Sequence, residues 1–230
     1  MAFVTPVPVL HDARIQLGSR RHGTAGLAVT RQRRSARLNM VAETSSPVAF
    51  STAGMTVEEF FERSSGLWRS QRSSHILAFA QFEAITSEIS IESVSVSDER
   101  IKALAAQHDV PQGEIAIGIH MRWEGESDWD DDTEGPLSGE TTLAVTKGSE
   151  KSGKLLRSSG YAESIPAVGE WHMTDGGVFV LETLYEAAAA EERIWFATKD
   201  LRIRVSQIRT SSGAGVVSAS MSTEIRRLKL

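Results

Sequence analysis

Two arginines and a serine alternate with aliphatic residues in one short segment near the carboxyl end of the chain. Arg202, Arg204 and Ser206 are each separated by a single aliphatic residue. A strand sends successive side chains to opposite faces, so both guanidinium groups and the hydroxyl share one face. These groups bind carboxylates, and a charge-assisted hydrogen bond of this kind contributes about 1.5–3 kcal/mol. The segment therefore predicts either a sheet with a solvated basic face or a barrel whose polar face points inward, toward a ligand that carries carboxylates.

Tryptophans stand close to charged residues in the middle of the chain. The odd-numbered positions of 115–123 form a continuous apolar face that ends at Trp123, and Trp129 follows after the break at Gly125. Packing is the simplest interpretation of both tryptophans. The acidic run 128–132 lacks the spacing of a calcium loop, and the histidines show no ligand spacing, so no metal site is predicted. The chain also contains no glycine-rich phosphate loop, zinc signature or nucleophile elbow, which leaves hydrolases and nucleotide-binding proteins without support.

From residue 68 onward the apolar residues recur with a period of two, which is typical of half-buried strands. The predicted strands lie at about 68–81, 87–96, 115–125, 138–147, 153–158, 168–174, 177–186, 191–198, 201–210 and 215–227. Two short helices are predicted, one at about 57–65 and one from 97 to about 108. Ten short strands in hairpin succession favour an all-β fold with minor α, an up-and-down antiparallel barrel. A sandwich is the alternative architecture.

The first 40 residues differ in charge from the rest of the chain. They contain seven arginines and a single acidic residue, Asp12, for a net charge of +6, which leaves −11 for residues 41–230 because the whole chain carries −5. The acidic remainder would repel phosphate, which argues against a nucleic-acid-binding protein. An arginine-rich, acid-poor leader is typical of a plastid or mitochondrial transit peptide, and a basic disordered tail that stays attached is the alternative.

The composition also indicates how the chain is divided into domains. Residues 1–40 are predicted to form a disordered transit peptide, 41–55 a linker, and 56–230 one domain with a substantial core. No secretory signal is evident, and no apolar run approaches the roughly 20 residues that span a membrane, so no membrane association is expected. The chain has no cysteine, which excludes disulfides, thiolate metal sites and a cysteine nucleophile of its own.

Five segments that occur in order carry a resemblance to a known family. They are 68–75 (WRSQRSSH), 121–125 (MRWEG), 155–163 (LLRSSGYAE), 192–197 (ERIWFA) and 224–227 (EIRR). Together they resemble the S-type phycobilin lyases, the chromophore lyases that attach linear tetrapyrroles (bilins) to phycobiliproteins. The resemblance covers roughly residues 56–228, the whole predicted domain.

The resemblance implies a lipocalin-like or fatty-acid-binding-like β-barrel with a bilin in its mouth. The implied reaction joins ring A of a bilin, such as phycoerythrobilin or phycocyanobilin, through a thioether to a cysteine of an apo-phycobiliprotein subunit. The bilin is the transferred substrate, and no prosthetic group is expected. The basic leader fits a plastid-targeted algal member of the family. The oligomeric state is left open between a homodimer and a pair of related lyase subunits.

The family's functional positions fall on six residues of this chain, and Arg204 joins them from the residue pattern. They are Trp123, Trp129, Glu192, Arg202, Ser206 and Glu224. We expect the arginines and the serine to bind the bilin propionates and the tryptophans to contact the conjugated face. Glu192, Glu224 and Arg202 are assigned to catalysis, because a carboxylate near the pyrrole N–H groups would keep the bilin protonated and its ethylidene carbon electrophilic.

Three further expectations are open to test. An inward-facing charge is costly without a partner, and a Glu192–Arg202 pair on adjacent strands is the simplest arrangement. Arg72 and Arg157 lie in family-like segments, but surface or fold-stabilising roles explain them equally well. A non-catalytic bilin or lipid carrier of the same fold is the alternative function, and a structural barrel with its arginines in water is a third possibility.

Overall fold

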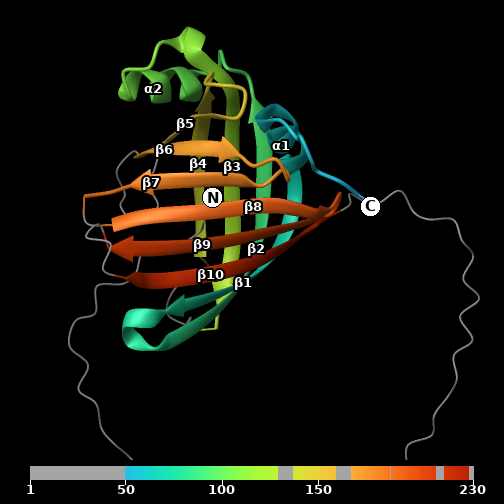
Figure 1. Ribbon diagram of the computed structural model, residues 1–230, viewed down its shortest axis with the longest axis vertical. Coiled ribbons are helices and arrows are strands. Elements are labelled where there is room, and N and C mark those ends of the chain that lie inside the picture. Colours follow the sequence, from blue (N-terminus) through green and yellow to red (C-terminus); the bar gives the residue numbers. More distant parts are fainter. Residues whose placement is uncertain (1–49, 129–136, 159–166, 187, 211–214, 228–230) are drawn as a thin grey trace, which may run out of the picture. The chain divides into compact units, whose positions relative to one another are not determined.

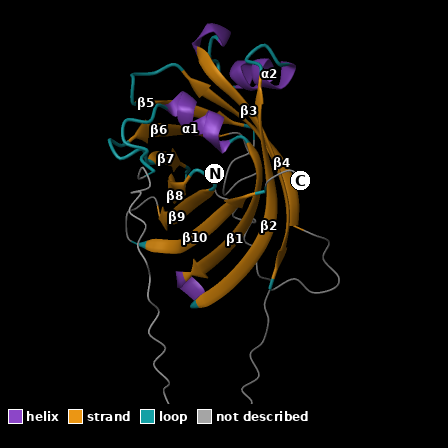
Figure 2. Cartoon of the chain, turned by 90° about the vertical axis from the view of Figure 1, so that its right-hand side faces the viewer, coloured by secondary structure: helices purple, strands orange, loops and turns teal. Residues whose placement is uncertain are grey.

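The computed structural model describes residues 50–128, 137–158, 167–186, 188–210 and 215–227. Within them ten antiparallel strands close into a barrel, in which each strand pairs with its neighbours in the chain and β1 pairs with β10 (Figures 1 and 2). The strands are β1 (Gly66–Ile76), β2 (Gln81–Val94), β3 (Ile115–Ser127), β4 (Leu137–Thr146), β5 (Ser152–Arg157), β6 (Ala167–Met173), β7 (Phe179–Leu184), β8 (Ala188–Thr198), β9 (Leu201–Thr210) and β10 (Val216–Arg226). The predicted up-and-down barrel is confirmed, and the sandwich is not adopted.

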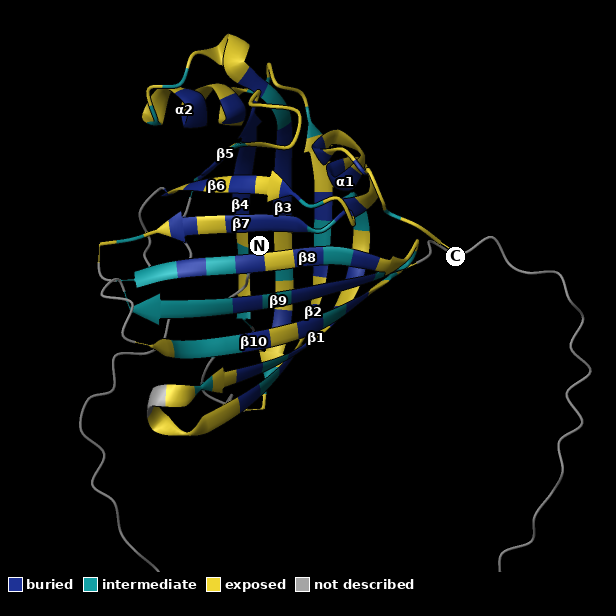
Figure 3. Cartoon of the chain, in the orientation of Figure 1, coloured by how far each residue is buried: buried dark blue, intermediate teal, exposed yellow. Residues whose placement is uncertain are grey.

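The alternation of residue types along the strands explains which side of the wall each side chain takes. In β6 every second residue is buried, from Ala167 to Met173, and the residues between them are exposed, a pattern visible along the strand in Figure 3. In β9 the residues that alternate on the enclosed face are Arg202, Arg204 and Ser206, so this strand turns a polar face inward. Figure 1 shows β6–β10 running across β2–β4, so the inner faces of the two groups look toward each other.

Helix α1 (Val57–Ser64) fills one end of the barrel. Phe60 and Phe61 are buried, and the Phe60 ring stacks on the Phe179 ring with 4.9 Å between centroids. The apolar cluster around them extends to Trp68 and Phe196 on the barrel wall. We call this the near end, and we call the opposite end, where β1, β3, β5, β7 and β9 finish, the far end. Aromatic rings therefore fill the interior of the barrel at the near end.

A capping box starts α1, as the sequence predicts. The Thr56 hydroxyl accepts a hydrogen bond from the Glu59 amide, and the Glu59 carboxylate accepts one from the Thr56 amide. Replacement of Thr56 by alanine is therefore expected to lower the free energy of unfolding by about 1 kcal/mol. Urea denaturation of the two proteins checks this, with Gln71→Ala on the exposed outer face as the control. An unchanged midpoint for Thr56→Ala would show that the cap contributes nothing.

Helix α2 (Glu99–Gln107) lies outside the barrel, against β4 and β5. Its Ile101 and Leu104 pack with Ala144 and Leu156, which face outward from the wall and form a second, smaller core. The Asp98 carboxylate caps this helix by accepting a hydrogen bond from the Arg100 amide. A short turn of 3₁₀ helix, η2 (Gln112–Glu114), leads into β3. No described helix is long and apolar enough to cross a membrane.

The connection between β1 and β2 differs from the prediction. The sequence predicts a strand to about 81 and a second from about 87, whereas β1 ends at Ile76 and β2 already begins at Gln81. A 3₁₀ turn, η1 (Leu77–Phe79), and the left-handed conformation of Ala80 reverse the chain between them. Neither glycine nor proline marks this turn, and its apolar residues resemble a continuing strand, which explains the missed boundary.

Candidate functional site

The inner wall carries a cluster of buried polar and charged residues beyond the apolar core of the near end. They are Arg72, Glu83, Arg157, Glu192, Arg202, Arg204, Ser206, Ser220, Ser222 and Glu224. Most of them lie on the consecutive strands β8, β9, β10, β1 and β2. The polar face of β9 therefore points into the barrel, as the barrel interpretation predicts. The alternative of a structural barrel with its arginines in water is wrong. Buried charges are costly unless they have partners, so their pairing decides what this wall can do.

Glu224 holds two arginines at the centre of the cluster. It lies directly opposite Arg202 in the pairing of β9 with β10, and its carboxylate is 2.5 Å from Nη2 of Arg202 and 3.2 Å from Nη2 of Arg204. Each of the three residues is at most 3% exposed. Burial alone would raise the pKa of the Glu224 carboxyl, but the two guanidinium groups outweigh it and hold the pKa below its usual value. Two cations on one carboxylate leave the cluster with positive charge that a ligand carboxylate can use.

Arg202 is also tied to the apolar core. Its guanidinium carbon lies 4.8 Å from the centroid of the Trp68 ring, and the guanidinium of Arg226 lies over the same ring at 4.2 Å. The Trp68 indole N–H donates to the Ser64 carbonyl at the end of α1. Burial lowers the pKa of Arg202 and Glu224 opposes that effect. Arg202 therefore lies at the base of the cluster, whereas Arg204 and Ser206 follow it toward the far end.

The predicted pairing of Glu192 with Arg202 is wrong. The register of β8 on β9 places Glu192 opposite Ser206, and Arg202 opposite Phe196. Glu192 instead forms an ion pair with Arg157 on β5, at 3.4 Å. The physical reason is the short turn between the two strands, which fixes the register, while closure of the barrel brings β5 within reach of β8.

Arg72 and Arg157 both face the interior, a placement that the sequence did not decide. Arg72 is 7% exposed and lies opposite Ser222 of β10, and Arg157 is 6% exposed. A signal for Arg72 is present in the sequence, since it has the same parity in its strand as Trp68. Both residues therefore extend the cationic part of the inner wall.

Trp123 lies on the inner wall of β3, and Gly139 faces it from β4. A Cβ atom at Gly139 would collide with the Trp123 indole, so the glycine provides a flat surface for this ring. Trp123 is partly buried and packs against the main core. Trp129, the other predicted tryptophan, lies outside the described residues.

Replacement of Gly139 by valine is expected to displace the Trp123 ring from the wall. The variant should show a shifted tryptophan emission maximum and, if Trp123 contacts the ligand, a bilin affinity reduced by about 10-fold, since aromatic contacts contribute about 0.5–1.5 kcal/mol beyond area burial. Fluorescence and bilin titration measure the two effects. Gly113→Val, where a Cβ meets nothing, is the control. Parent-like emission would contradict the account of the glycine.

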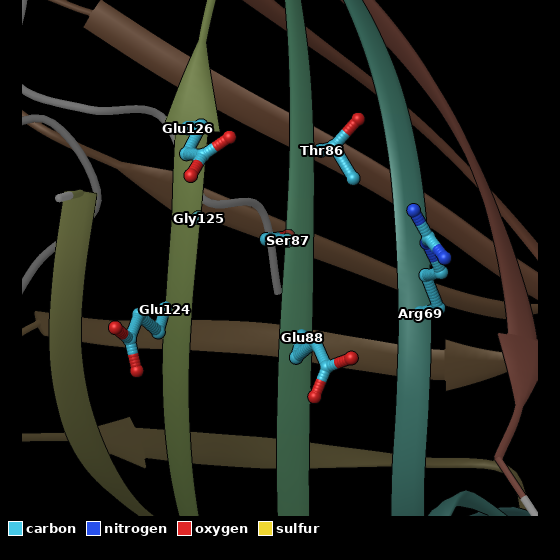
Figure 4. A pocket seen from close by; sticks show the side chains of 7 residues that line it. All are labelled: Arg69, Thr86, Ser87, Glu88, Glu124, Gly125 and Glu126. Carbon is cyan, nitrogen blue, oxygen red and sulfur yellow. The ribbon is translucent and has the colours of Figure 1, made fainter.

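Two hollows on the outer surface are separate from this cluster. One, of about 240 Å³, crosses β1, β2 and β3; Figure 4 shows its carboxylates, Glu88, Glu124 and Glu126, with Arg69 as the basic residue. Its negative charge is unsuited to a ligand with carboxylates. The other, of about 540 Å³, lies beside α2 and is lined by His120 among others. The described residues contain no group of three or more side chains suited to a metal ion.

A closed barrel with a charged, enclosed inner wall defines a small-ligand-binding β-barrel of the lipocalin-like kind. The chain matches the family model described as CpeS-like protein over residues 56–227. It therefore belongs to the CpeS-like family.

Named relatives agree with this assignment. The chain is 49% identical to Chromophore lyase CpcS/CpeS 3 of Trichodesmium erythraeum over 174 residues, which cover 75% of this chain and 99% of that protein. It is 36% identical to Phycocyanobilin lyase subunit CpcS of Picosynechococcus sp., with 74% of this chain and 86% of that protein covered. The solved structure of the S-type phycobiliprotein lyase CPES from Guillardia theta matches with a TM-score of 0.69 and 48% identity, over 78% of this chain and 97% of that one.

Proposed function

We propose that this chain is a phycobilin lyase, an enzyme that binds a linear tetrapyrrole and attaches it through a thioether to a cysteine of a phycobiliprotein subunit. The observation that carries the proposal is the enclosed Arg202–Glu224–Arg204 cluster on the inner wall. Membership of the CpeS-like family and relatives named as chromophore lyases support it.

The chemistry of a bilin suits the inner wall. Its two propionates require cationic and hydroxyl donors, which Arg204 and Ser206 supply in the part of the cluster nearer the far end. Its pyrrole N–H groups require an acceptor, and the Glu192 and Glu224 carboxylates lie on strands that flank those donors. Trp123 offers an aromatic face for the conjugated rings. Arg202, which is enclosed by Trp68 and Glu224, would act by holding Glu224 in position.

In this arrangement the reaction depends on orientation and on the charge of the bilin. The barrel would fix one conformation of the bilin and present ring A at the far end, because the near end is filled by α1. A carboxylate beside the pyrrole nitrogens would stabilise the protonated bilin, whose ethylidene carbon is more electrophilic. The nucleophile is the cysteine of the acceptor subunit, since the chain has none.

The identity of the bilin, the compartment and the assembly are finer proposals. Phycoerythrobilin and phycocyanobilin are the bilins we propose, and the relative from Picosynechococcus sp. is named for the latter. We propose a plastid location on the composition of residues 1–40, which lie outside the described residues and whose role as a transit peptide stays a prediction. That relative is also named as a subunit, so a pair of related chains is an alternative to a homodimer.

An attachment assay distinguishes the lyase from a carrier with the same barrel. The full chain is incubated with a bilin and an apo-phycobiliprotein subunit, and the adduct is followed after acid denaturation. A lyase accelerates the formation of one acid-stable adduct at one cysteine. A coloured complex with no acceleration over bilin and acceptor alone would establish the carrier and refute the proposal.

A further inference from the structure

Glu83 is a carboxylate of the inner wall that has no part in the proposed function. It is the third residue of β2 and lies at the far end of the barrel, opposite Ser74 of β1. Both side chains are buried, Glu83 at 9% exposed and Ser74 at 6%. The carboxylate is therefore enclosed by the wall at the far end, opposite the end that α1 fills.

The partners of Glu83 differ from those of the deeper carboxylates. Its Oε1 accepts a hydrogen bond from the Ser127 hydroxyl at 2.7 Å, and no ion pair or other hydrogen bond joins it to the part of the chain that the structure describes. Arg72 lies one inward-facing position deeper on β1, and Asp128, directly after β3, accepts a hydrogen bond from the Ala84 amide. Among the described residues, the second carboxylate oxygen of Glu83 accepts no hydrogen bond.

The position of Glu83 relative to the predicted acids also argues for a separate role. A row of cross-strand neighbours, Glu83, Ser74, Ser220, Ser206 and Glu192, follows the wall from β2 to β8. The two carboxylates lie at its ends, four strands apart, with three hydroxyl groups between them. Glu192 lies on the strand beside Arg204 and Ser206, whereas Glu83 lies at the far end, where the proposed function places ring A.

The reaction needs a proton acceptor at that place. A cysteine with an ordinary pKa near 8.5 is only about 3% thiolate at pH 7. Resting on the proposed function, we propose that Glu83 is the general base that takes the proton from the acceptor cysteine. The deeper acids Glu192 and Glu224 are each bound to guanidinium groups and are less suited to this step.

The step is a net addition and balances without an oxidant or reductant. The S–H bond breaks and its proton passes to the Glu83 carboxylate, while the sulfur electron pair forms the S–C bond to the ethylidene carbon of ring A. The π pair of the ethylidene double bond moves to the adjacent ring carbon. That carbon takes up the proton from protonated Glu83, which restores the carboxylate.

The test compares Glu83→Gln with the full-length parent, with Glu88→Gln on the exposed face of the same strand as the control. Bilin affinity is measured by absorbance titration, and attachment to the acceptor subunit is followed from pH 6 to 9.5. We expect Glu83→Gln to bind bilin like the parent and to attach it about 30-fold more slowly at pH 7, with the gap closing as the pH rises past about 8.5. Glu83→Asp, which keeps a carboxylate, is expected to recover the pH profile of the parent at an intermediate rate.

The possible outcomes separate this inference from the proposed function. Parent-like attachment by Glu83→Gln, a pH-independent loss, or a weakened bilin affinity would each overturn the role as base. If Glu83→Gln fails to fold, Glu83→Asp decides, since a profile unlike that of the parent would contradict proton transfer to this carboxylate. A parent chain that accelerates no attachment at any pH would refute the lyase function itself.

Discussion

Replacement of Glu224 by glutamine is expected to lower the free energy of unfolding at pH 7 by about 3–5 kcal/mol and to abolish tight bilin binding. The change removes the carboxylate that neutralises Arg202 and Arg204 inside the wall, and removing one partner of a buried ion pair leaves a charge whose desolvation nothing offsets. Urea denaturation of the parent and the variant measures the effect. Equal stability at pH 7 would mean that water reaches the cluster and that the wall is not enclosed.

A triple variant separates the effect of the buried charges from the effect of the packing of the cluster. Replacing Arg202 and Arg204 by methionine and Glu224 by leucine removes both signs of charge together, and such apolar replacements are often neutral or stabilising. We expect this variant to recover most of the stability that Glu224→Gln loses, but not the bilin affinity. Recovery of both properties would show that the charges serve neither the ligand nor the reaction.

The same cluster predicts a dependence of stability on pH. The pKa of Glu224 lies below its usual value in the folded protein, so its ionised form contributes stability above about pH 4.3, the value for an unfolded chain. That contribution is lost as the pH falls through the lower folded pKa. The stability gap between the parent and Glu224→Gln should therefore be full at pH 7 and narrow below about pH 4. A gap that is constant from pH 7 to pH 3 would contradict the assignment.

Replacement of Arg204 by alanine is expected to weaken bilin binding by about 10- to 100-fold while the barrel stays folded. The loss corresponds to one charge-assisted hydrogen bond to a propionate, about 1.5–3 kcal/mol. Glu224 keeps its closest partner, Arg202, so the variant retains the central ion pair. Absorbance titration measures the affinity, and Arg209→Ala, on the other face of the same strand, is the control.

The dimethyl ester of the bilin tests whether Arg204 recognises a propionate. Esterification removes the negative charge from both propionates, so the parent should bind the ester at least as weakly as Arg204→Ala binds the free acid. The variant should lose little further affinity for the ester, because the interaction is already absent. If both changes weaken binding independently and their effects add fully, Arg204 acts on another part of the bilin.

Residue types and their period were sufficient to favour a barrel and to place Arg202, Arg204 and Ser206 on one face of β9, but they left open whether that face is solvated or enclosed. The alternation of Arg202, Arg204 and Ser206 with aliphatic residues defines one polar face, and the succession of strands with short turns indicates that the wall closes. The burial of Arg202, Arg204 and Ser206 in the structure shows that this face is the inner one. Glu192 and Glu224 also lie on the inner wall, as the family resemblance implies, and their roles stay predictions.

The pairing of charges depends on contacts that the sequence does not specify. The Arg157–Glu192 ion pair joins β5 to β8, which are not neighbours in the barrel, so only the curvature of the closed wall brings them together. The predicted Glu192–Arg202 pair is wrong because the alternation of residue types predicts which face of a strand a side chain takes, but not which residue lies opposite it on the next strand. Glu83 was missed because the turn before β2 contains neither glycine nor proline, so the strand was predicted to begin several residues after Glu83.

The proposed function depends most on the inner wall being the place where the bilin binds. A crystal structure of the full chain with bound bilin tests this directly. We expect the tetrapyrrole inside the barrel, with a propionate oxygen within about 3.2 Å of the Arg204 guanidinium or the Ser206 hydroxyl and ring A toward the far end. A bilin bound to the outer surface, with Arg204 and Glu224 unchanged around an interior that excludes it, would contradict the account.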